Sequence, residues 1–250
     1  MVWNNALDPA AYIEMAEVES RHWWFTGRRA ILSSLIKQLN LPGHARILEI
    51  GCGTGGNLDM LAAFGKVSAF DMDENARAIA SNKTAGVFDI REGYCPDHIP
   101  FEDERFDLIC MFDVLEHIEQ DVETLAVIKS RLAEGGRVLM TVPAYQWMYG
   151  VHDTFLHHKR RYSSRELHKK LQACGYRLSR FSYFNTLLFP LAAAVRVKEK
   201  WLGSKAAAGT NVPPDFANHF LQTIFSAESR WLKRANFPFG VSIVCILEVE

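Results

Sequence analysis

The stretch ILEIGCGTGGNL contains the residues whose spacing says most about chemistry. Glycine has no Cβ, so a glycine-rich loop can bring backbone N–H groups close to a bound ligand. Gly51, Gly53 and Gly56 fit the dinucleotide pattern G-x-G-x-x-G, whereas Glu49, Gly51, Gly53 and Gly55 fit E-x-G-x-G-x-G. The two patterns indicate different cofactors, so residues elsewhere in the chain must distinguish them.

A carboxylate follows the glycine loop at the separation that a nucleoside ligand requires. Asp71 ends the apolar stretch KVSAFD and lies 20 residues after Gly51. In a strand–glycine loop–helix unit, the next strand often ends in an acid that holds ribose hydroxyls. The spacing therefore predicts an adenosine-type ligand, and the alternative is a glycine-rich turn with a purely structural role.

Acids and histidines also follow two later apolar stretches. DVLEH comes directly after RFDLICMF, and VHDTFLHHKRRY follows RVLMTVPA. Histidine exchanges a proton near neutral pH, and a proton acceptor beside a bound substrate can act as a general base. The candidate catalytic residues in these two segments are His117, His152, Asp153 and His157.

The second of these segments is rich in cations as well. A small acceptor that carries a phosphate or carboxylate would bind such side chains. An exposed helix face and a solvated loop explain the same charge run. No aromatic-interleaved platform or nucleic-acid-binding module is present, so nucleic acid is not expected as a partner. The candidate substrate-binding residues are His158, Arg160, Arg161 and Tyr162.

The elements that must position these residues alternate between strand and helix. Apolar strands are predicted at ARILEI, KVSAFDMD, GVFDIREG, RFDLICMFDV and RVLMTVPA. Helical patterns lie between them at NLDMLAAFG, ENARAIASN and EQDVETLAVIKSRLAEGG. This alternation predicts an α/β fold with a Rossmann-like, doubly wound parallel sheet, whose strands present ligands at their carboxyl ends.

Further helices and strands flank this core. Residues 10–40 have the spacing of two helices, AAYIEMAEVESRHWWF and RRAILSSLIKQL. Ser163 and Glu166 form a capping box before the helix SSRELHKKLQACG, and strands are predicted at YRLSRFSYFN and VSIVCILEV. We expect a single domain with N-terminal helices at 1–43, a core at 44–185 and 239–250, and a helical cap inserted at 186–238.

Composition excludes several classes of protein. The net charge is −1, so the whole molecule has no bulk attraction for nucleic acid or anionic membranes. The five cysteines form no C-x-x-C pair, which indicates a reducing compartment. The start of the chain does not have the pattern of a signal peptide, and the longest apolar run, 187–195, is far shorter than the roughly 20 residues of a membrane span. We expect a cytoplasmic protein with no transmembrane segment.

Together, these motifs resemble the class I S-adenosylmethionine-dependent methyltransferases, in the type 11 branch that carries DVLEH after its fourth strand. Glu49 supports this family, because dinucleotide enzymes usually have an apolar residue at that point. The resemblance covers residues 47–142 closely. It implies S-adenosyl-L-methionine as the cofactor and a sheet of seven strands with an antiparallel last strand.

The resemblance also implies roles for particular residues. The glycine loop would carry the methionine part of the cofactor, with Glu49 ordering the loop. Asp71 would hold the ribose hydroxyls, and Met72 would pack on the adenine. The family often has an acid for the adenine amine where this chain has other residues, in REGYCPDH. The implied cofactor-binding residues are Trp24, Arg28, Glu49, Gly51, Cys52, Gly53, Gly55, Asn57, Asp71, Met72, Gly93, Tyr94, Asp113, Val114 and His117.

The stretch HWWFTGRR has two interpretations. Two tryptophans on an N-terminal helix are often simply part of the core. Methyltransferases of this type, however, often close the cofactor pocket with an N-terminal helix. The resemblance therefore places Trp24 and Arg28 near the cofactor, with Arg28 as a partner for its carboxylate.

A bound metal is expected to be absent, and one alternative is left open. Asp113, Glu116 and His117 mimic the acid-x-x-Glu-His cluster of the ubiquinone-pathway O-methyltransferases and the small-RNA 3′-end methyltransferases, which use a divalent ion. Such an ion would bind vicinal hydroxyls and lower their pKa. Relatives with DVLEH that need no metal favour the metal-free interpretation.

The expected function is methyl transfer to a small-molecule acceptor, with O-methylation favoured over N- or C-methylation. The sulfonium of the cofactor is already activated, so holding the acceptor in line accounts for much of the catalysis. Aromatic and aliphatic residues of the cap suit an apolar, glycan-pathway or natural-product intermediate, or a homodimer contact. The alternatives are an NAD(P)-dependent oxidoreductase and a protein that binds S-adenosylmethionine without catalysis.

Overall fold

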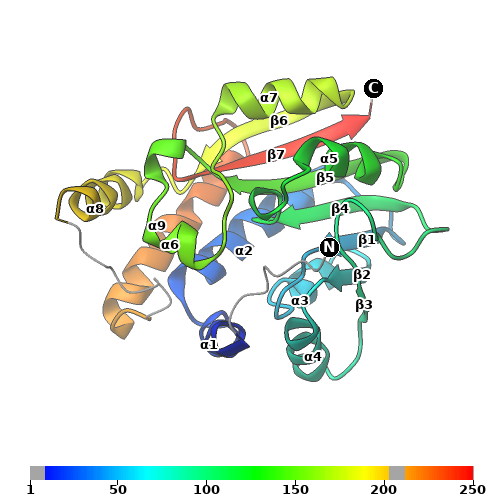
Figure 1. The fold of residues 1–250 in the computed structure, drawn as a ribbon, viewed down its shortest axis with the longest axis horizontal. Helices are drawn as coiled ribbons and strands as arrows, with labels where there is room; N and C mark the ends of the chain where they lie inside the picture. Colours follow the sequence, from blue (N-terminus) through cyan, green and yellow to red (C-terminus); the bar gives the residue numbers. More distant parts are fainter. Residues whose placement is uncertain (1–8, 203–211, 250) are drawn as a thin grey trace.

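The computed structural model describes residues 9–202 and 212–249, and its centre is a seven-stranded sheet (Figure 1). The strands are β1 (Arg46–Ile50), β2 (Lys66–Asp71), β3 (Asp89–Glu92), β4 (Phe106–Phe112), β5 (Leu132–Pro143), β6 (Tyr176–Phe184) and β7 (Ser242–Val249). Their order is β3-β2-β1-β4-β5-β7-β6. Strands β1 to β5 are parallel, and β7 lies antiparallel between β5 and β6. The predicted doubly wound sheet with an antiparallel last strand is therefore confirmed.

Helices cover both faces of this sheet. They are α1 (Pro9–Val18), α2 (Trp23–Ile36), α3 (Leu58–Ala62), α4 (Glu74–Lys83), α5 (Asp121–Lys129), α6 (Val151–Phe155), α7 (Ser164–Ala173), α8 (Phe189–Leu202) and α9 (Asp215–Leu232). Short 3-10 turns occur at η1 (Lys37–Leu39), η2 (Leu115–His117) and η3 (Gln146–Met148). Helices α5 and α7 pack on one face, whereas α2, α3 and α9 pack on the other.

Strand alternation divides the apolar residues between these two layers. Ile47 of β1 packs with the layer of α2 and α9, whereas Leu48 and Ile50 pack with the layer of α5 and α7. Successive side chains of a strand point to opposite faces, so a strand that is apolar throughout must be covered on both. The continuous apolar runs of β1 and β4 therefore require helices on both sides of the sheet.

Two predicted boundaries differ from the structure. HWWF begins α2 instead of ending the helix before it, because the His22 ring accepts a hydrogen bond from the Trp24 N–H (3.2 Å) and caps the new helix. The helix predicted to run to Gly136 ends at Lys129. The chain from Leu132 onward pairs with β4, and a Cβ at Gly136 would lie 2.7 Å from the Phe106 carbonyl oxygen. Close approach of two strands, and not helix termination alone, explains this glycine.

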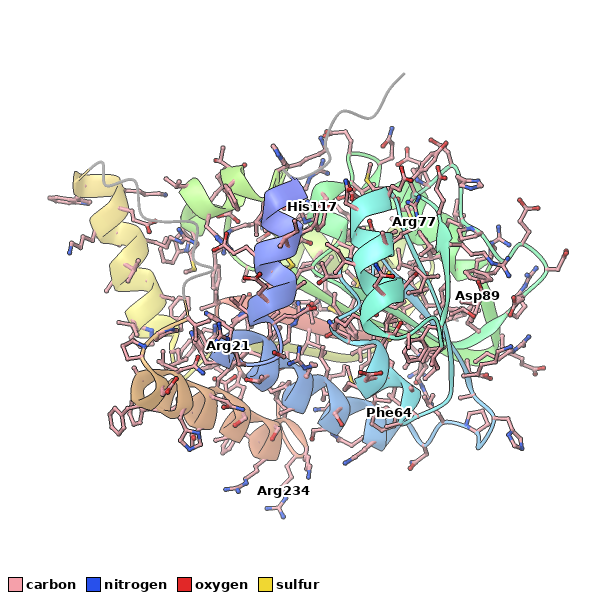
Figure 2. The ribbon with its side chains drawn as sticks, turned by 90° about the horizontal axis from the view of Figure 1, so that it is seen from below. Arg21, Phe64, Arg77, Asp89, His117 and Arg234 are labelled. Atoms are coloured by element: carbon pink, nitrogen blue, oxygen red, sulfur yellow. The ribbon has the colours of Figure 1, made fainter. Side chains whose placement is uncertain are left out.

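The predicted cap at 186–238 divides into two parts with different surroundings. Helix α9 packs beside α2, with Phe225 fully buried against that layer. Figure 2 shows both helices along one side of the molecule, with Arg234 pointing away from the protein. Helix α8 lies apart from the sheet (Figure 1), and the connecting residues 203–211 lie outside the described residues.

None of the helices that the structure describes is long and apolar enough to cross a membrane.

Candidate functional site

The carboxyl ends of β1, β2, β4 and β5 open into a cavity of about 730 Å³. Helices α1 and α2 border one side of the cavity, and α6 and α8 border another. Most of the predicted cofactor and acceptor residues therefore line one continuous space, whereas Glu49 and Gly55 lie behind its wall. The sequence-predicted residues that line it are Trp24, Arg28, Gly51, Cys52, Gly53, Asn57, Asp71, Met72, Gly93, Tyr94, Asp113, Val114, Glu116, His117, His152, His157, His158 and Arg161.

The glycine loop after β1 has the backbone that its sequence suggests. Gly51, Gly53 and Gly55 have φ values of +66°, +53° and +77°, a region that disfavours other residues. A Cβ on Gly51 would lie 2.7 Å from the Val114 side chain, whereas a Cβ on Gly53 would meet nothing within 4 Å. Gly53 thus faces open space in which a ligand can approach the backbone.

Gly56, the glycine that completes the dinucleotide pattern, serves a different purpose. A Cβ there would clash with a carboxylate oxygen of Glu19, a buried residue just after α1. Glu19 also accepts a hydrogen bond from the Thr54 hydroxyl (2.9 Å) and pairs with Lys83. The glycine is therefore explained by packing of the N-terminal segment. Sequence reasoning missed Glu19, because nothing in its local pattern distinguishes it from an exposed helix acid.

Glu49 lies behind the glycine loop and is almost completely buried. Its Oε1 accepts a hydrogen bond from the Asn57 side chain (2.8 Å), and its Oε2 has no partner among the described residues. Burial raises the pKa of this carboxyl to about 8, although the Asn57 hydrogen bond and the charge of Arg28 oppose the shift. An unpartnered buried oxygen indicates that a further donor belongs in this position.

Asp71 ends β2 and is held mainly by backbone groups. Its Oδ2 accepts the Gly53 N–H (2.8 Å), and its Oδ1 accepts the Asp73 N–H (2.9 Å). Burial raises its pKa, and these two hydrogen bonds oppose that change. Met72 follows directly and remains 41% exposed at the cavity. An acid and an apolar side chain thus stand together at the end of β2.

Asp113 directly follows β4 and has a strained conformation, with φ +58°. Its carboxylate forms an ion pair with Arg28, whose guanidinium stacks over the Trp24 ring at 4.3 Å. The Arg28 Nε has no hydrogen-bond partner among the described residues. Both side chains line the cavity, and the Arg28 Nε–H remains as a donor for a ligand.

Glu116 and His117 follow in the turn after β4, and His158 reaches them from the segment after α6. Glu116 is fully buried, and neither carboxylate oxygen has a hydrogen-bond partner among the described residues. The rings of His117 and His158 are 4.7 Å apart and perpendicular. Burial raises the pKa of Glu116 well above its usual range and lowers the pKa of His117 to about 3. His117 is therefore a neutral imidazole at physiological pH.

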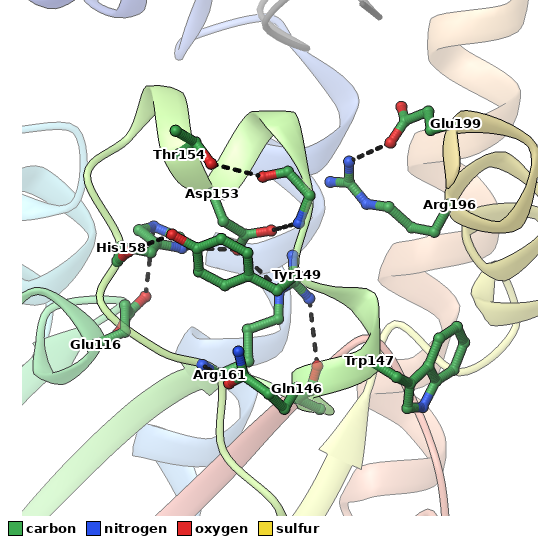
Figure 3. Close-up of polar contacts among 12 residues, drawn as sticks. Glu116, Gln146, Trp147, Tyr149, Asp153, Thr154, His158, Arg161, Arg196 and Glu199 are labelled. Carbon is green, nitrogen blue, oxygen red and sulfur yellow. Dashed lines mark hydrogen bonds and ion pairs between the residues drawn. The ribbon is translucent and has the colours of Figure 1, made fainter. Parts of the chain in front are cut away.

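Asp153 lies behind His158 instead of in the cavity (Figure 3). Its buried carboxylate accepts hydrogen bonds from the Arg161 Nε (2.8 Å) and the Gly150 N–H (2.9 Å), and its Oδ1 lies 2.9 Å from His158 Nδ1. Burial opposes ionisation, but the partners His158 and Arg161 outweigh it and hold the pKa of Asp153 well below its usual range. Asp153 can therefore act on a ligand only through His158 or Arg161, its two side-chain partners that line the cavity.

The structure does not bring Arg160 and Tyr162 to the cavity. Tyr162 is fully buried, and its hydroxyl donates to Asp121 Oδ2 (2.9 Å). Arg160 points the same way and pairs with Asp121 and Glu119, each at 3.1 Å. A buried hydroxyl must find a partner, and Asp121 provides it away from the cavity. Arg160 and Tyr162 are therefore no longer candidates for substrate binding.

His152 and His157 line the cavity, and α8 forms the wall beside them. Helix α8 contributes apolar side chains that include Leu191 and Val195. It also contributes Arg196, whose guanidinium pairs with Glu199 (2.8 Å) beside the start of α6. This part of the cavity thus combines apolar and charged side chains of α8.

Comparison with known proteins agrees with this geometry. A family model described as methyltransferase domain matches residues 23–181. An uncharacterized methyltransferase of Staphylococcus carnosus is 34% identical over 111 residues, 43% of this chain and 52% of that protein. A protein of Mycolicibacterium smegmatis, named "Probable S-adenosylmethionine-dependent methyltransferase", is 27% identical over 158 residues, 62% and 60% of the two chains. The chain thus spans between half and two thirds of the length of these relatives.

Solved structures agree on the fold. An S-adenosylmethionine-dependent methyltransferase from Clostridium acetobutylicum has a TM-score of 0.58 at 12% identity, covering 88% of this chain and 90% of that chain. One from Aquifex aeolicus has a TM-score of 0.57 at 20% identity, covering 71% and 93%. The chain therefore belongs to the methyltransferase domain family and has the fold of the class I S-adenosylmethionine-dependent methyltransferases.

Proposed function

We propose that this protein transfers a methyl group from S-adenosylmethionine to a small-molecule acceptor, with an oxygen as the favoured acceptor atom. The observation that carries the proposal is the set of unfilled positions around the glycine loop. Among residues 9–202 and 212–249, Glu49 Oε2 has no donor and Arg28 Nε has no acceptor, and Gly53 faces open space. A ligand with an ammonium and a carboxylate group, as in a methionine moiety, supplies both missing partners.

The chain's residues would hold the cofactor as follows. Glu49 would accept a hydrogen bond from the ammonium group, and Arg28 would donate to the carboxylate. Asp71 would accept the ribose hydroxyls while the Gly53 and Asp73 amides keep it in place. Met72 would pack on the adenine. The cofactor supplies a methyl group on a sulfonium, so the chain has only to orient the acceptor, exclude water and accept a proton.

The acceptor side favours a molecule with an apolar part. Leu191 and Val195 of α8 form an apolar wall, and His117, His152 and His157 face the same cavity. A histidine beside a bound hydroxyl group can accept its proton, and the place of His152 and His157 at the cavity favours an oxygen acceptor. A relative in Aromatoleum aromaticum, 25% identical over 150 residues, is named a ubiquinone biosynthesis O-methyltransferase and supports the same preference. An apolar glycan-pathway or natural-product intermediate fits this wall.

Calorimetric titration of the full chain tests the cofactor. We expect S-adenosylmethionine and S-adenosylhomocysteine to bind, and NADH to leave the heat signal unchanged. Binding of NADH alone would overturn the proposal and favour an oxidoreductase. Gly56, the glycine that the dinucleotide pattern requires, is already explained by its contact with Glu19, which weakens that alternative.

Product formation separates an enzyme from a protein that only binds the cofactor. Apolar hydroxylated compounds can be screened for S-adenosylhomocysteine release, with release in the absence of acceptor as the background. An enzyme would release more product with at least one acceptor class. Tight cofactor binding with no release above background across hydroxyl, amine and carbon acceptors would favour the non-catalytic alternative.

A further inference from the structure

Glu116 is fully buried, yet neither of its carboxylate oxygens has a hydrogen-bond partner among the described residues. Burying a polar group without a partner is costly, and a carboxylate with two unpartnered oxygens is especially so. The side chains of His117 and His158 each bring a possible ligand atom to within 4.8 Å of it. We propose that Glu116, His117 and His158 bind a divalent transition-metal ion.

The spacing of the three side chains suits one small cation. Each offers one ligand atom, and these atoms lie within 4.8 Å of one another. His158 Nε2 lies 3.9 Å from the nearer Glu116 oxygen. Nitrogen and oxygen ligands lie about 2.0–2.2 Å from zinc, which separates them by about 3.4 Å in a tetrahedral site. Small rotations of the three side chains therefore bring them to binding distance.

A second layer of contacts aims His158 at this position. Asp153 Oδ1 lies 2.9 Å from His158 Nδ1, so the carboxylate holds the ring proton on Nδ1 and leaves the lone pair on Nε2. Asp153 is itself held by the Arg161 Nε and the Gly150 N–H. A carboxylate behind a histidine is the usual way in which proteins orient a metal-binding imidazole.

The ligand set differs from the one expected from DVLEH alone. Asp113 forms an ion pair with Arg28 and is therefore engaged elsewhere. His158, contributed by a distant segment, replaces it. Two imidazoles and one carboxylate favour zinc or another first-row transition metal over magnesium, which prefers oxygen ligands.

Three protein ligands leave coordination positions open toward the cavity. All three side chains line the same space as the cofactor residues. An ion there would bind an acceptor oxygen and lower the pKa of an acceptor hydroxyl, a role that rests on the proposed function. Metal binding itself does not rest on it and can be measured without an acceptor.

Metal titration of the full chain tests the proposal. The protein is freed of metal with a chelator, dialysed, and titrated with Zn²⁺ by calorimetry and with Co²⁺ by visible absorption. We expect one ion per chain and Co²⁺ bands that report nitrogen ligation. Mg²⁺ should bind at least a hundredfold more weakly than Zn²⁺, because the site contains two imidazoles.

Matched variants locate the ion. Glu116→Gln and His117→Gln should each lower Zn²⁺ affinity at least tenfold, as loss of one ligand does. Glu119→Gln and His44→Asn change the same residue types at exposed positions and should leave affinity unchanged. Circular dichroism verifies that each variant is folded. Two ligand variants of different chemistry keep the test decisive if one of them fails to fold.

Two results would contradict a metal site at these residues. In the first, the wild type binds Zn²⁺ no more tightly than folded Glu116→Gln does. In the second, the exposed-site variants lose as much Zn²⁺ affinity as the ligand variants. S-adenosylhomocysteine affinity is measured on the same samples. Zn²⁺ binding without cofactor binding would refute the proposed function and leave the metal site standing. Cofactor binding without Zn²⁺ binding would refute the metal site and leave the proposed function standing.

Discussion

The acid at the end of β2 and the acids that follow β4 and β5 lie at the same edge of the sheet but are stabilised in different ways. Asp71, the last residue of β2, accepts two backbone N–H groups from its own neighbourhood. Asp113, after β4, pairs with the Arg28 side chain, and Asp153, after β5, pairs with the side chains of Arg161 and His158. The proposed cofactor half, around Asp71 and the glycine loop, is thus held mainly by local backbone, and the proposed acceptor half, around Asp153 and His158, mainly by side-chain contacts.

This difference has consequences for mutation. A backbone N–H is present whatever the side chain of its residue, so the environment of Asp71 tolerates changes nearby. Removing one member of a buried side-chain network destabilises the fold, because the remaining charges stay buried without partners. We therefore expect substitutions in the acceptor half to affect stability, and substitutions in the cofactor half to affect mainly ligand binding.

The largest effect is expected from Asp153→Ala. The substitution leaves Arg161, which is 5% exposed, and His158 without their shared carboxylate. The free energy of unfolding should fall by about 3–5 kcal/mol, measured by urea denaturation at neutral pH. Glu119→Ala removes a carboxylate that is 65% exposed, and should cost less than about 1 kcal/mol. Equal losses in the two variants would contradict the expected cost of leaving Arg161 and His158 without their buried carboxylate.

Glu49→Gln tests the exception within the cofactor half. Burial raises the Glu49 pKa from 4.5 in the unfolded chain to about 8, so the folded state binds an extra proton between these values. Its contribution to stability is complete below pH 4.5 and is lost as the pH rises through 8. The free energy of unfolding of the cofactor-free wild type should therefore fall between pH 5 and pH 9. The fall should exceed that of Glu49→Gln by an amount on the order of a few kcal/mol, measured by thermal unfolding. If stability changed with pH in the same way in both proteins, Glu49 would not be the group that titrates.

Asp71→Ala should affect ligand binding more than folding. Loss of a charge-assisted pair of hydrogen bonds costs about 1.5–3 kcal/mol, a tenfold to hundredfold loss of S-adenosylhomocysteine affinity by calorimetry. Asp59→Ala changes an exposed acid of the nearby α3 and serves as the control. Unchanged affinity in folded Asp71→Ala would exclude its role in holding the ribose.

The smallest effect is expected from Arg28→Lys. Lysine retains the charge near Asp113 but loses the planar fork that stacks on Trp24 and that donates from Nε. Cofactor affinity should fall by severalfold, with Arg21→Lys, an exposed neighbour, unchanged. A loss as large as that of Asp71→Ala would show that the cofactor half also depends on a side chain from a distant segment.

The glycine loop and its acid could be predicted because their spacing reflects local geometry. Gly51, Gly53 and Gly55 have positive φ within five residues, and Asp71 ends the very next strand. Periodicity did not reveal that α9 packs beside α2 or that Glu19 contacts Gly56. Those contacts join residues far apart in the chain, and the sequence alone carries no record of which distant faces meet.

The sequence by itself determined the order of strands and helices, the glycine loop and the acids at the strand ends, since each depends on residues within a few positions. Only the tertiary structure decided the orientation of the side chains between 152 and 162. There Tyr162 turns to buried Asp121, whereas His158 turns to Glu116. The physical reason is that every buried polar group needs a partner, and the available partners come from segments that only folding brings together.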